Sequence, residues 1–118
     1  MIRQAEQIFK ALADGSRLKV LMALEDGEMC VCQITALLGF AQSTVSRHMQ
    51  VLQHAGLVMS EKRGMWVFYR LPGSEAPREI KNTLKLFRET WCHGGEYQQL
   101  KEQVKRIKSM KREKLCKK

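Results

Sequence analysis

The chain has 118 residues and a mass of 13.7 kDa, the size of a single small domain. Its residues are 44% hydrophobic and 28% charged, a mixture typical of a folded globular protein, and its apolar runs are too short for a membrane-spanning helix. The first residues carry charges and lack the apolar stretch of a secretory signal, so we expect a cytoplasmic protein with no membrane partner. In that reducing setting the four cysteines favour metal binding or thiol chemistry over a disulfide framework.

The net charge of +9 is concentrated at the C-terminal end of the chain. Nine of the 21 Lys and Arg residues lie between residues 101 and 118, against two of the 12 acidic residues. We therefore divide the chain into a domain over residues 1–100 and a basic tail over residues 101–118. Such a tail suits a polyanionic partner but is equally typical of a solvated surface, so charge alone does not establish nucleic-acid binding.

The spacing of apolar residues predicts four helices in the first half of the chain. Asp14 can cap the second helix, and Gly39 ends the third. In the fourth helix Val45, Met49 and Leu52 fall on one inward stripe. The predicted helices cover residues 2–14, 15–25, 31–38 and 42–54.

The second half of the chain predicts two strands and one long helix. The strands cover residues 57–61 and 65–71, and residues 62–64 join them in a turn with two cations at its tip. The long helix begins at about Pro77, and Gly94-Gly95 is a place where it can bend or break. Short helices joined by a tight turn and followed by a hairpin indicate a mainly α fold with a β-hairpin wing, the winged helix-turn-helix.

The fourth predicted helix carries the polar side chains that a helix in a DNA groove needs. Arg47 and Gln42 suit base readout, because Arg can grip guanine and Gln adenine through two hydrogen bonds each. A run of hydroxyls also suits a solvated helix start, and the cationic hairpin that follows favours the DNA interpretation. The predicted DNA-binding residues are Gln42, Ser43, Thr44, Ser46, Arg47 and His48 on the helix, with Lys62 and Arg63 holding phosphate from the wing.

Five sequence blocks together resemble the ArsR/SmtB family of metal-sensing repressors. The blocks are LADGSRL at 12–18, EMCVC at 28–32, QSTVSRH at 42–48, AGLV at 55–58 and GMWVFYRL at 64–71. The resemblance covers about residues 5–92. It implies a homodimer built on the first and last helices, which binds double-stranded operator DNA and leaves it when a metal or metalloid binds. A two-fold dimer implies an operator with an inverted repeat.

Cys30 and Cys32 are similar to the sensor of the arsenic- and antimony-responsive branch of that family. Soft thiolate ligands select soft ions such as As(III) and Sb(III), which we expect as the inducer, with no organic cofactor. On a regular helix residues i and i+2 lie about 200° apart, so we expect binding through both sulfurs to unwind the first turn of the third helix. The predicted function is repression of a metalloid-resistance operon.

The third metalloid ligand is left open, because Thr35 stands where that branch often has another cysteine. The candidates are Cys116, Cys92 or an external thiol or hydroxide, and we prefer Cys116 over Cys92. Alternatives on the same scaffold are a thiol-redox repressor and a cadmium- or lead-responsive repressor. A thiol enzyme or metal carrier is disfavoured, because no His or Asp beside Cys30 can serve as a base.

Overall fold

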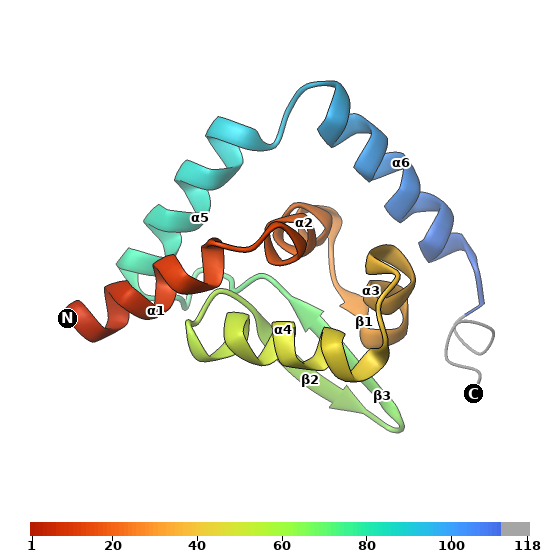
Figure 1. The fold of residues 1–118 in the computed structure, drawn as a ribbon, viewed down its shortest axis with the longest axis horizontal. Helices are drawn as coiled ribbons and strands as arrows, with labels where there is room; N and C mark the ends of the chain where they lie inside the picture. Colours follow the sequence, from red (N-terminus) through yellow and green to blue (C-terminus); the bar gives the residue numbers. More distant parts are fainter. Residues whose placement is uncertain (112–118) are drawn as a thin grey trace.

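Six α-helices, one 3-10 turn and three short strands make up residues 1–111, which are the residues that the computed structural model describes (Figure 1). The helices are α1 (Ile2–Leu12), α2 (Gly15–Ala23), α3 (Val31–Leu38), α4 (Gln42–His54), α5 (Arg78–Trp91) and α6 (Gly95–Ser109). The strands are β1 (Met29–Cys30), β2 (Met59–Arg63) and β3 (Trp66–Arg70), and the 3-10 turn η1 covers Leu24–Asp26. The winged helix-turn-helix predicted from the sequence is confirmed, and α3 and α4 have the predicted bounds.

The helix-turn-helix is held by a core between α2, α3 and α4. Its turn passes through Gly39, whose φ of 74° is a left-handed conformation that glycine adopts without a steric penalty. On α4 the predicted inward residues Val45, Met49 and Leu52 are fully buried. Side chains from the other elements complete this core, among them Ala11, Val20, Leu21, Met29, Ile34, Leu57 and Val58.

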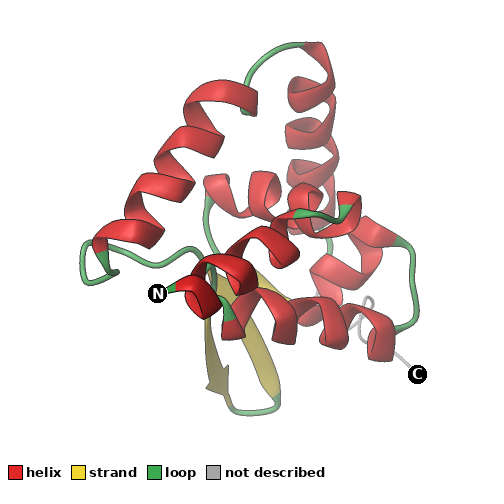
Figure 2. Cartoon of the chain, turned by 60° about the vertical axis from the view of Figure 1, so that its left-hand side comes forward, coloured by secondary structure: helices red, strands yellow, loops and turns green. Residues whose placement is uncertain are grey.

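The wing is part of a three-stranded antiparallel sheet in the order β1-β3-β2. Ser60 lies opposite Tyr69 in the hairpin, and Cys30 of β1 lies opposite Phe68 on the other side of β3. Figure 2 shows the two longer strands projecting from beneath the helices as a narrow ribbon. β1 was not expected from the sequence, because two residues are too few to show an alternating pattern. Its presence brings the segment before α3 directly against the base of the wing.

The long helix expected after Pro77 is divided into two helices, at the Gly94-Gly95 position where the sequence allows a bend or break. The helices α5 and α6 are the two limbs of an arch over α2 (Figure 1), and Gly94, with a φ of 92°, lies at the bend between them. The second limb packs against α2 and α3 through its buried side chains Tyr97, Leu100, Val104 and Ile107.

The helix α6 runs across residue 100, where the basic tail was expected to begin. Its apolar stripe continues into the basic segment, so the rise in Lys and Arg content does not mark the end of the packed domain. Lys101 lies 3.8 Å from the Asp26 carboxylate, and Lys108 donates to the Asp26 carbonyl at 3.3 Å. Within residues 1–111 no helix combines the length and apolar character needed to cross a membrane.

Candidate nucleic-acid interface and cysteine site

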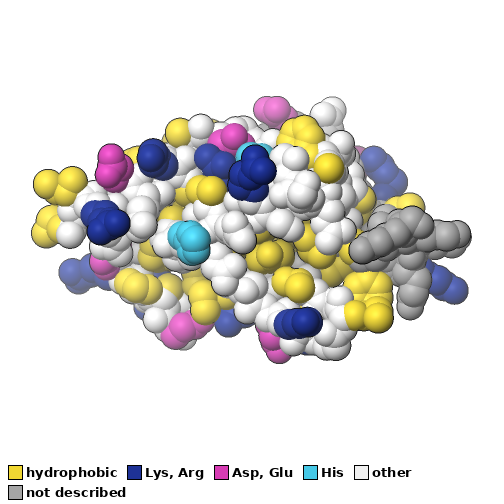
Figure 3. Space-filling model, turned by 60° about the horizontal axis from the view of Figure 1, so that its bottom comes forward, with side chains coloured by type: hydrophobic (Ala, Val, Ile, Leu, Met, Phe, Trp, Pro, Cys, Tyr) yellow, Lys and Arg dark blue, Asp and Glu magenta, His cyan; other side chains and the backbone are white. Residues whose placement is uncertain are grey.

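The outer surface of α4 places the predicted DNA-binding residues around the start of one exposed helix. Gln42, Ser43 and Arg47 are exposed, whereas Thr44, Ser46 and His48 are half-buried. Figure 3 looks onto the side of the molecule where α4 and the hairpin lie, and it shows Lys and Arg side chains scattered singly, with hydrophobic atoms between them. This surface is therefore suited to base-edge contacts supported by a few phosphate contacts, rather than to charge attraction alone.

His48 is tied to the rest of the domain by Arg17 of α2. An Arg17 Nη1 nitrogen lies 3.0 Å from His48 Nδ1, and because guanidinium groups only donate, Nδ1 accepts and the ring proton resides on Nε2. The same guanidinium donates to the carbonyls of Ala11 at 2.9 Å and Lys10 at 3.1 Å. Arg17 thus joins the end of α1 to the recognition helix α4. Helical periodicity predicts that His48 lies on the outer side of α4 but does not reveal Arg17 as its partner, because the two residues are 31 positions apart.

Asp14 begins α2 as its N-cap, as the sequence predicts. Its Oδ1 accepts the backbone N–H groups of Ser16 at 2.9 Å and Arg17 at 3.1 Å. Burial raises the pKa of Asp14, but the hydrogen bond from the Arg17 N–H, the charge of Arg17 and the hydrogen bond from the Ser16 N–H outweigh burial and lower this pKa below its ordinary value.

The two cations of the wing lie in strand β2 rather than at the tip of the turn, which corrects the sequence prediction. Lys62 is exposed and makes no ion pair within residues 1–111. Arg63 instead donates to both oxygens of Glu28 at 2.7 Å and to Glu61 at 2.9 Å. The two wing cations therefore differ, since Arg63 is paired with two carboxylates and Lys62 has no ion pair within residues 1–111.

Cys30 and Cys32 form a small cluster with Phe68, separate from the main core. Cys30 is fully buried and Cys32 is 5% exposed, and Val31 and Trp66 pack against them. The expectation that α3 must unwind is corrected, because Cys30 precedes the helix as its N-cap with an extended backbone (φ −81°, ψ 161°). The 200° separation of two helical positions consequently does not apply to this pair.

Gln33 closes the start of α3 around Cys30. The Gln33 side-chain oxygen accepts the Cys30 N–H at 2.9 Å, and the Gln33 N–H points to the Cys30 side chain, which together make a capping box. Gln33 is itself buried. A ligand on the Cys30 sulfur therefore binds at the residue whose backbone N–H is held by Gln33 at the first turn of α3.

The candidate third ligands lie apart from the cysteine cluster or outside the described residues. Cys92 ends α5 against the main core, where burial and the Glu25 carboxylate raise the pKa of its thiol, although Arg88 opposes them. Cys116 lies outside the described residues. The Thr35 hydroxyl donates to the Val31 carbonyl at 2.7 Å. Within residues 1–111 no three His, Cys, Asp or Glu side chains gather as a metal site.

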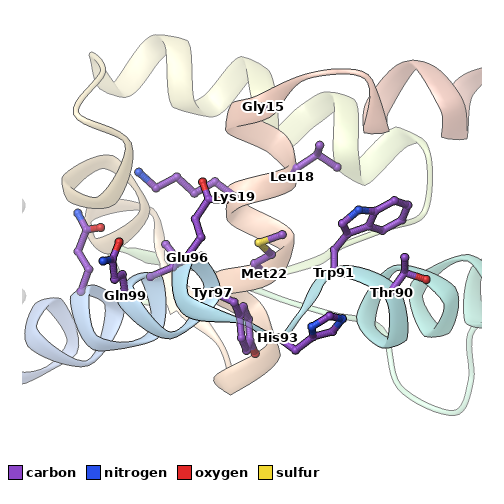
Figure 4. Close-up of a pocket in the computed structure, with 12 residues that line it drawn as sticks. Gly15, Leu18, Lys19, Met22, Thr90, Trp91, His93, Glu96, Tyr97 and Gln99 are labelled. Carbon is purple, nitrogen blue, oxygen red and sulfur yellow. The ribbon is translucent and has the colours of Figure 1, made fainter.

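A pocket of about 580 Å³ opens between α2 and the arch of α5 and α6 (Figure 4). Met22 and Trp91 provide apolar lining, and His93 and Glu96 stand at the same opening. The pocket includes neither of the clustered cysteines and no residue of α4. It is therefore separate from both candidate sites.

Comparison with known proteins places the chain in a family. Residues 14–60 match the model described as "Bacterial regulatory protein, arsR family". The arsenical resistance operon repressor of Escherichia coli is 38% identical over 86 residues, which are 72% of this chain and 70% of that protein. The arsenic resistance transcriptional regulator ArsR1 of Pseudomonas putida is 40% identical over 79 residues, 66% of this chain, and the match spans only 61% of that regulator.

A solved structure with the same fold agrees with this placement. It is the homodimeric winged helix-turn-helix DNA-binding domain of a possible ArsR-family regulator from Mycobacterium bovis, with a TM-score of 0.64 and 31% identity over 75% of this chain and 78% of that one. Members of the family regulate transcription by binding DNA and are not enzymes. The chain belongs to the arsR family of bacterial regulatory proteins.

Proposed function

We propose that the protein is a homodimeric repressor that leaves an inverted-repeat operator when As(III) or Sb(III) binds Cys30 and Cys32. The observation that carries the proposal is the buried cysteine cluster, which lies between the wing strand β3 and the first turn of α3. A ligand in this cluster contacts both parts of the DNA-binding unit. The similar proteins of E. coli and P. putida are named for arsenical and arsenic resistance, which supports the choice of inducer.

DNA recognition in this proposal divides between α4 and the wing. Arg47 and Gln42 read base edges from the exposed start of the helix, and the hydroxyls of Ser43, Thr44 and Ser46 contact base edges or phosphate. His48 donates its Nε2–H to a phosphate, because Arg17 already occupies Nδ1. Lys62 adds a phosphate contact from the wing.

The dimer surface is proposed on α1 and α5. Large apolar side chains are left exposed there: Ile2 at 83% and Phe9 at 70% on α1, and Leu86 at 62% on α5. Because a soluble monomer seldom exposes such side chains together, a second copy is the fitting cover. The last helix of the expected dimer is then α5 rather than α6, since α6 packs onto α2 and α3 of its own chain.

Metalloid binding in this proposal proceeds by exchange at arsenic. Cys32 is disulfide-bonded in the structure, so a thiol reductant, itself oxidised to a disulfide, must first return it to the thiol form. Arsenite then enters as As(OH)₃, and each thiol that bonds to arsenic gives its proton to a departing hydroxide, which leaves as water. The Cys30 sulfur then moves away from the Gln33 N–H, so the capping box at the start of α3 is lost. For the third position we keep Cys116 as the preferred ligand, since Cys92 packs with the main core rather than with the clustered cysteines.

A titration of operator DNA with and without arsenite, antimonite, cadmium and zinc tests the proposal. Arsenite and antimonite are expected to release DNA in strong reductant, a condition under which a thiol-redox repressor gives no response. Release by cadmium or zinc at lower concentration would contradict the assignment. X-ray absorption on the arsenite complexes of wild type, Cys92→Ser and Cys116→Ser then counts the sulfur ligands, and loss of one sulfur only in Cys116→Ser supports the preferred ligand.

A further inference from the structure

Arg63 connects the wing to the segment that leads into the cysteines. Its two terminal nitrogens donate to the two oxygens of Glu28, each at 2.7 Å, in a bidentate pair. Glu28 directly precedes β1. The pair therefore joins β2 to the N-terminal side of β1, across 35 positions of sequence.

Arg63 also touches the cysteine cluster through an aromatic ring. Its guanidinium carbon lies 4.4 Å from the centre of the Phe68 ring, within the range of a cation–π contact. Phe68 belongs to the cluster with Cys30 and Cys32 and lies opposite Cys30 in the sheet. Arg63 is thus attached to the cysteine site twice, through a carboxylate in the plane of its guanidinium and a ring against its face.

The chemistry of these contacts depends on the fork of the guanidinium. The Arg63 and Glu28 side chains are 43% and 39% exposed, and an exposed pair held by charge alone contributes little to stability. The guanidinium of Arg63 is planar: two of its nitrogens contact the carboxylate, and its face contacts the aromatic ring. These two contacts fix its orientation, and the ammonium group of a lysine cannot make both of them in this way. Arg63 is therefore better suited to fixing the positions of Glu28 and Phe68 relative to β2 than to binding a phosphate.

We infer that Arg63 is a positioning residue that transmits metalloid binding from the cysteine cluster to the wing, an inference that rests on the proposed function of Cys30 and Cys32. When the sulfurs move to bond the metalloid, the register between Cys30 and Phe68 at the two-residue strand β1 is disturbed. Arg63 then loses its ring or its carboxylate, and β2 shifts together with Lys62. The signal reaches the wing directly, alongside the path through α3 to α4.

Two conservative variants test the inference against a matched control. Glu28→Gln keeps the side-chain shape but removes the charge, and Arg63→Lys keeps the charge but removes the fork. Each is expected to reduce the ratio of operator affinities without and with saturating arsenite by about twofold to fivefold. The control Glu75→Gln removes the charge of another exposed Arg–Glu pair, Arg70–Glu75, which lies outside the cysteine cluster, and should leave both operator affinities and their ratio at the wild-type values.

Arsenite binding is measured separately, so that failure of the inference is distinguishable from failure of the proposed function. Trp66 packs against the cysteine cluster and becomes the only tryptophan once Trp91 is replaced by Phe, so its fluorescence reports the site. All variants in that background are expected to bind arsenite with wild-type affinity and to show wild-type thermal unfolding.

Two results would overturn the inference. If Glu28→Gln and Arg63→Lys bind arsenite and keep the wild-type ratio of operator affinities without and with arsenite, Arg63 does not transmit the signal, and the proposed function stands. If the Trp66 signal and the operator affinity of the wild type both ignore arsenite, the proposed function and the inference fail together.

Discussion

The helix α4 and the wing, the two elements that we propose to contact DNA, present their side chains by different structural means. On α4 the predicted contact residues follow from helical periodicity, because Val45, Met49 and Leu52 point inward and leave Gln42 and Arg47 outside. In the wing the neighbouring cations have separate roles that periodicity does not reveal. A cation on the wing can thus be paired with carboxylates of its own chain, and the wing is also where the cysteine cluster packs, against Phe68 of β3.

The largest expected effect is the loss of the arsenite response in Cys30→Ser. A hydroxyl preserves the size of the side chain and can still accept the Gln33 N–H, so operator binding should remain near that of the wild type. It cannot replace a soft thiolate, so release, typically a 5- to 150-fold effect in allosteric proteins, should disappear. Operator titration with arsenite measures this, with Cys92→Ser as the control. A Cys30→Ser protein that dissociates at the wild-type arsenite concentration would exclude this site.

The next effect separates base reading by α4 from phosphate contact by the wing. Arg47→Ala should cost roughly 1–3 kcal/mol on operator DNA and flatten the base preference at one position of each half-site. Lys62→Ala should instead weaken operator and random DNA alike. Competition titrations against single-base operator variants measure the difference. If Arg47→Ala keeps the wild-type base preference, α4 does not read DNA in the proposed way.

Local signals explain why the helix-turn-helix was predictable and its surroundings were not. The bounds of α3 and α4 follow from Gly39 and from apolar spacing within each helix, which neighbouring residues determine. Arg17 and His48 are 31 positions apart, and Arg63 and Glu28 are 35 apart. Periodicity reports that a residue is exposed or buried but not which distant residue it meets. The same limit hid β1, which exists only because β3 lies beside it.

The C-terminal region shows a second limit of sequence reasoning. A rise in positive charge after residue 100 suggested a tail, although the apolar stripe of α6 continues through Val104 and Ile107. Both residues are buried, so the stripe was the better guide to folding than the charge. Among the site residues, Cys30 and Cys32 pack in one cluster with Phe68, and their position before and within α3 required the structure. Their role as metalloid ligands stays a prediction.

A smaller effect tests whether α4 is held in position by Arg17. Arg17→Gln removes the donor to His48 and to the carbonyls of Lys10 and Ala11, and the Arg17 side chain is only 15% exposed. Loss of these partly buried hydrogen bonds should lower the free energy of unfolding by about 1–3 kcal/mol. Urea unfolding measures it, with the exposed Arg3→Gln as control. Equal stability of the two variants would show that Arg17 does not anchor α4 to α1.

The smallest effect is a pH dependence at the cap of α2. The pKa of Asp14 is lower in the folded protein than its ordinary value, so the unfolded chain binds the proton more tightly than the folded one. The stabilisation by the Asp14 charge is therefore complete above the unfolded pKa of about 3.9 and is lost as the pH falls through the lower, folded pKa.

Asp14→Asn keeps a capping oxygen without a charge, whereas Asp14→Ala removes the cap and should lower the free energy of unfolding by about 1 kcal/mol at pH 7. Urea unfolding from pH 7 to pH 3 should give Asp14→Asn a slightly lower free energy of unfolding than the wild type. This deficit should be constant down to about pH 5 and shrink below pH 4. A deficit that stays constant to pH 3 would assign the role of Asp14 to its hydrogen bonds with the Ser16 and Arg17 N–H groups and not to its charge.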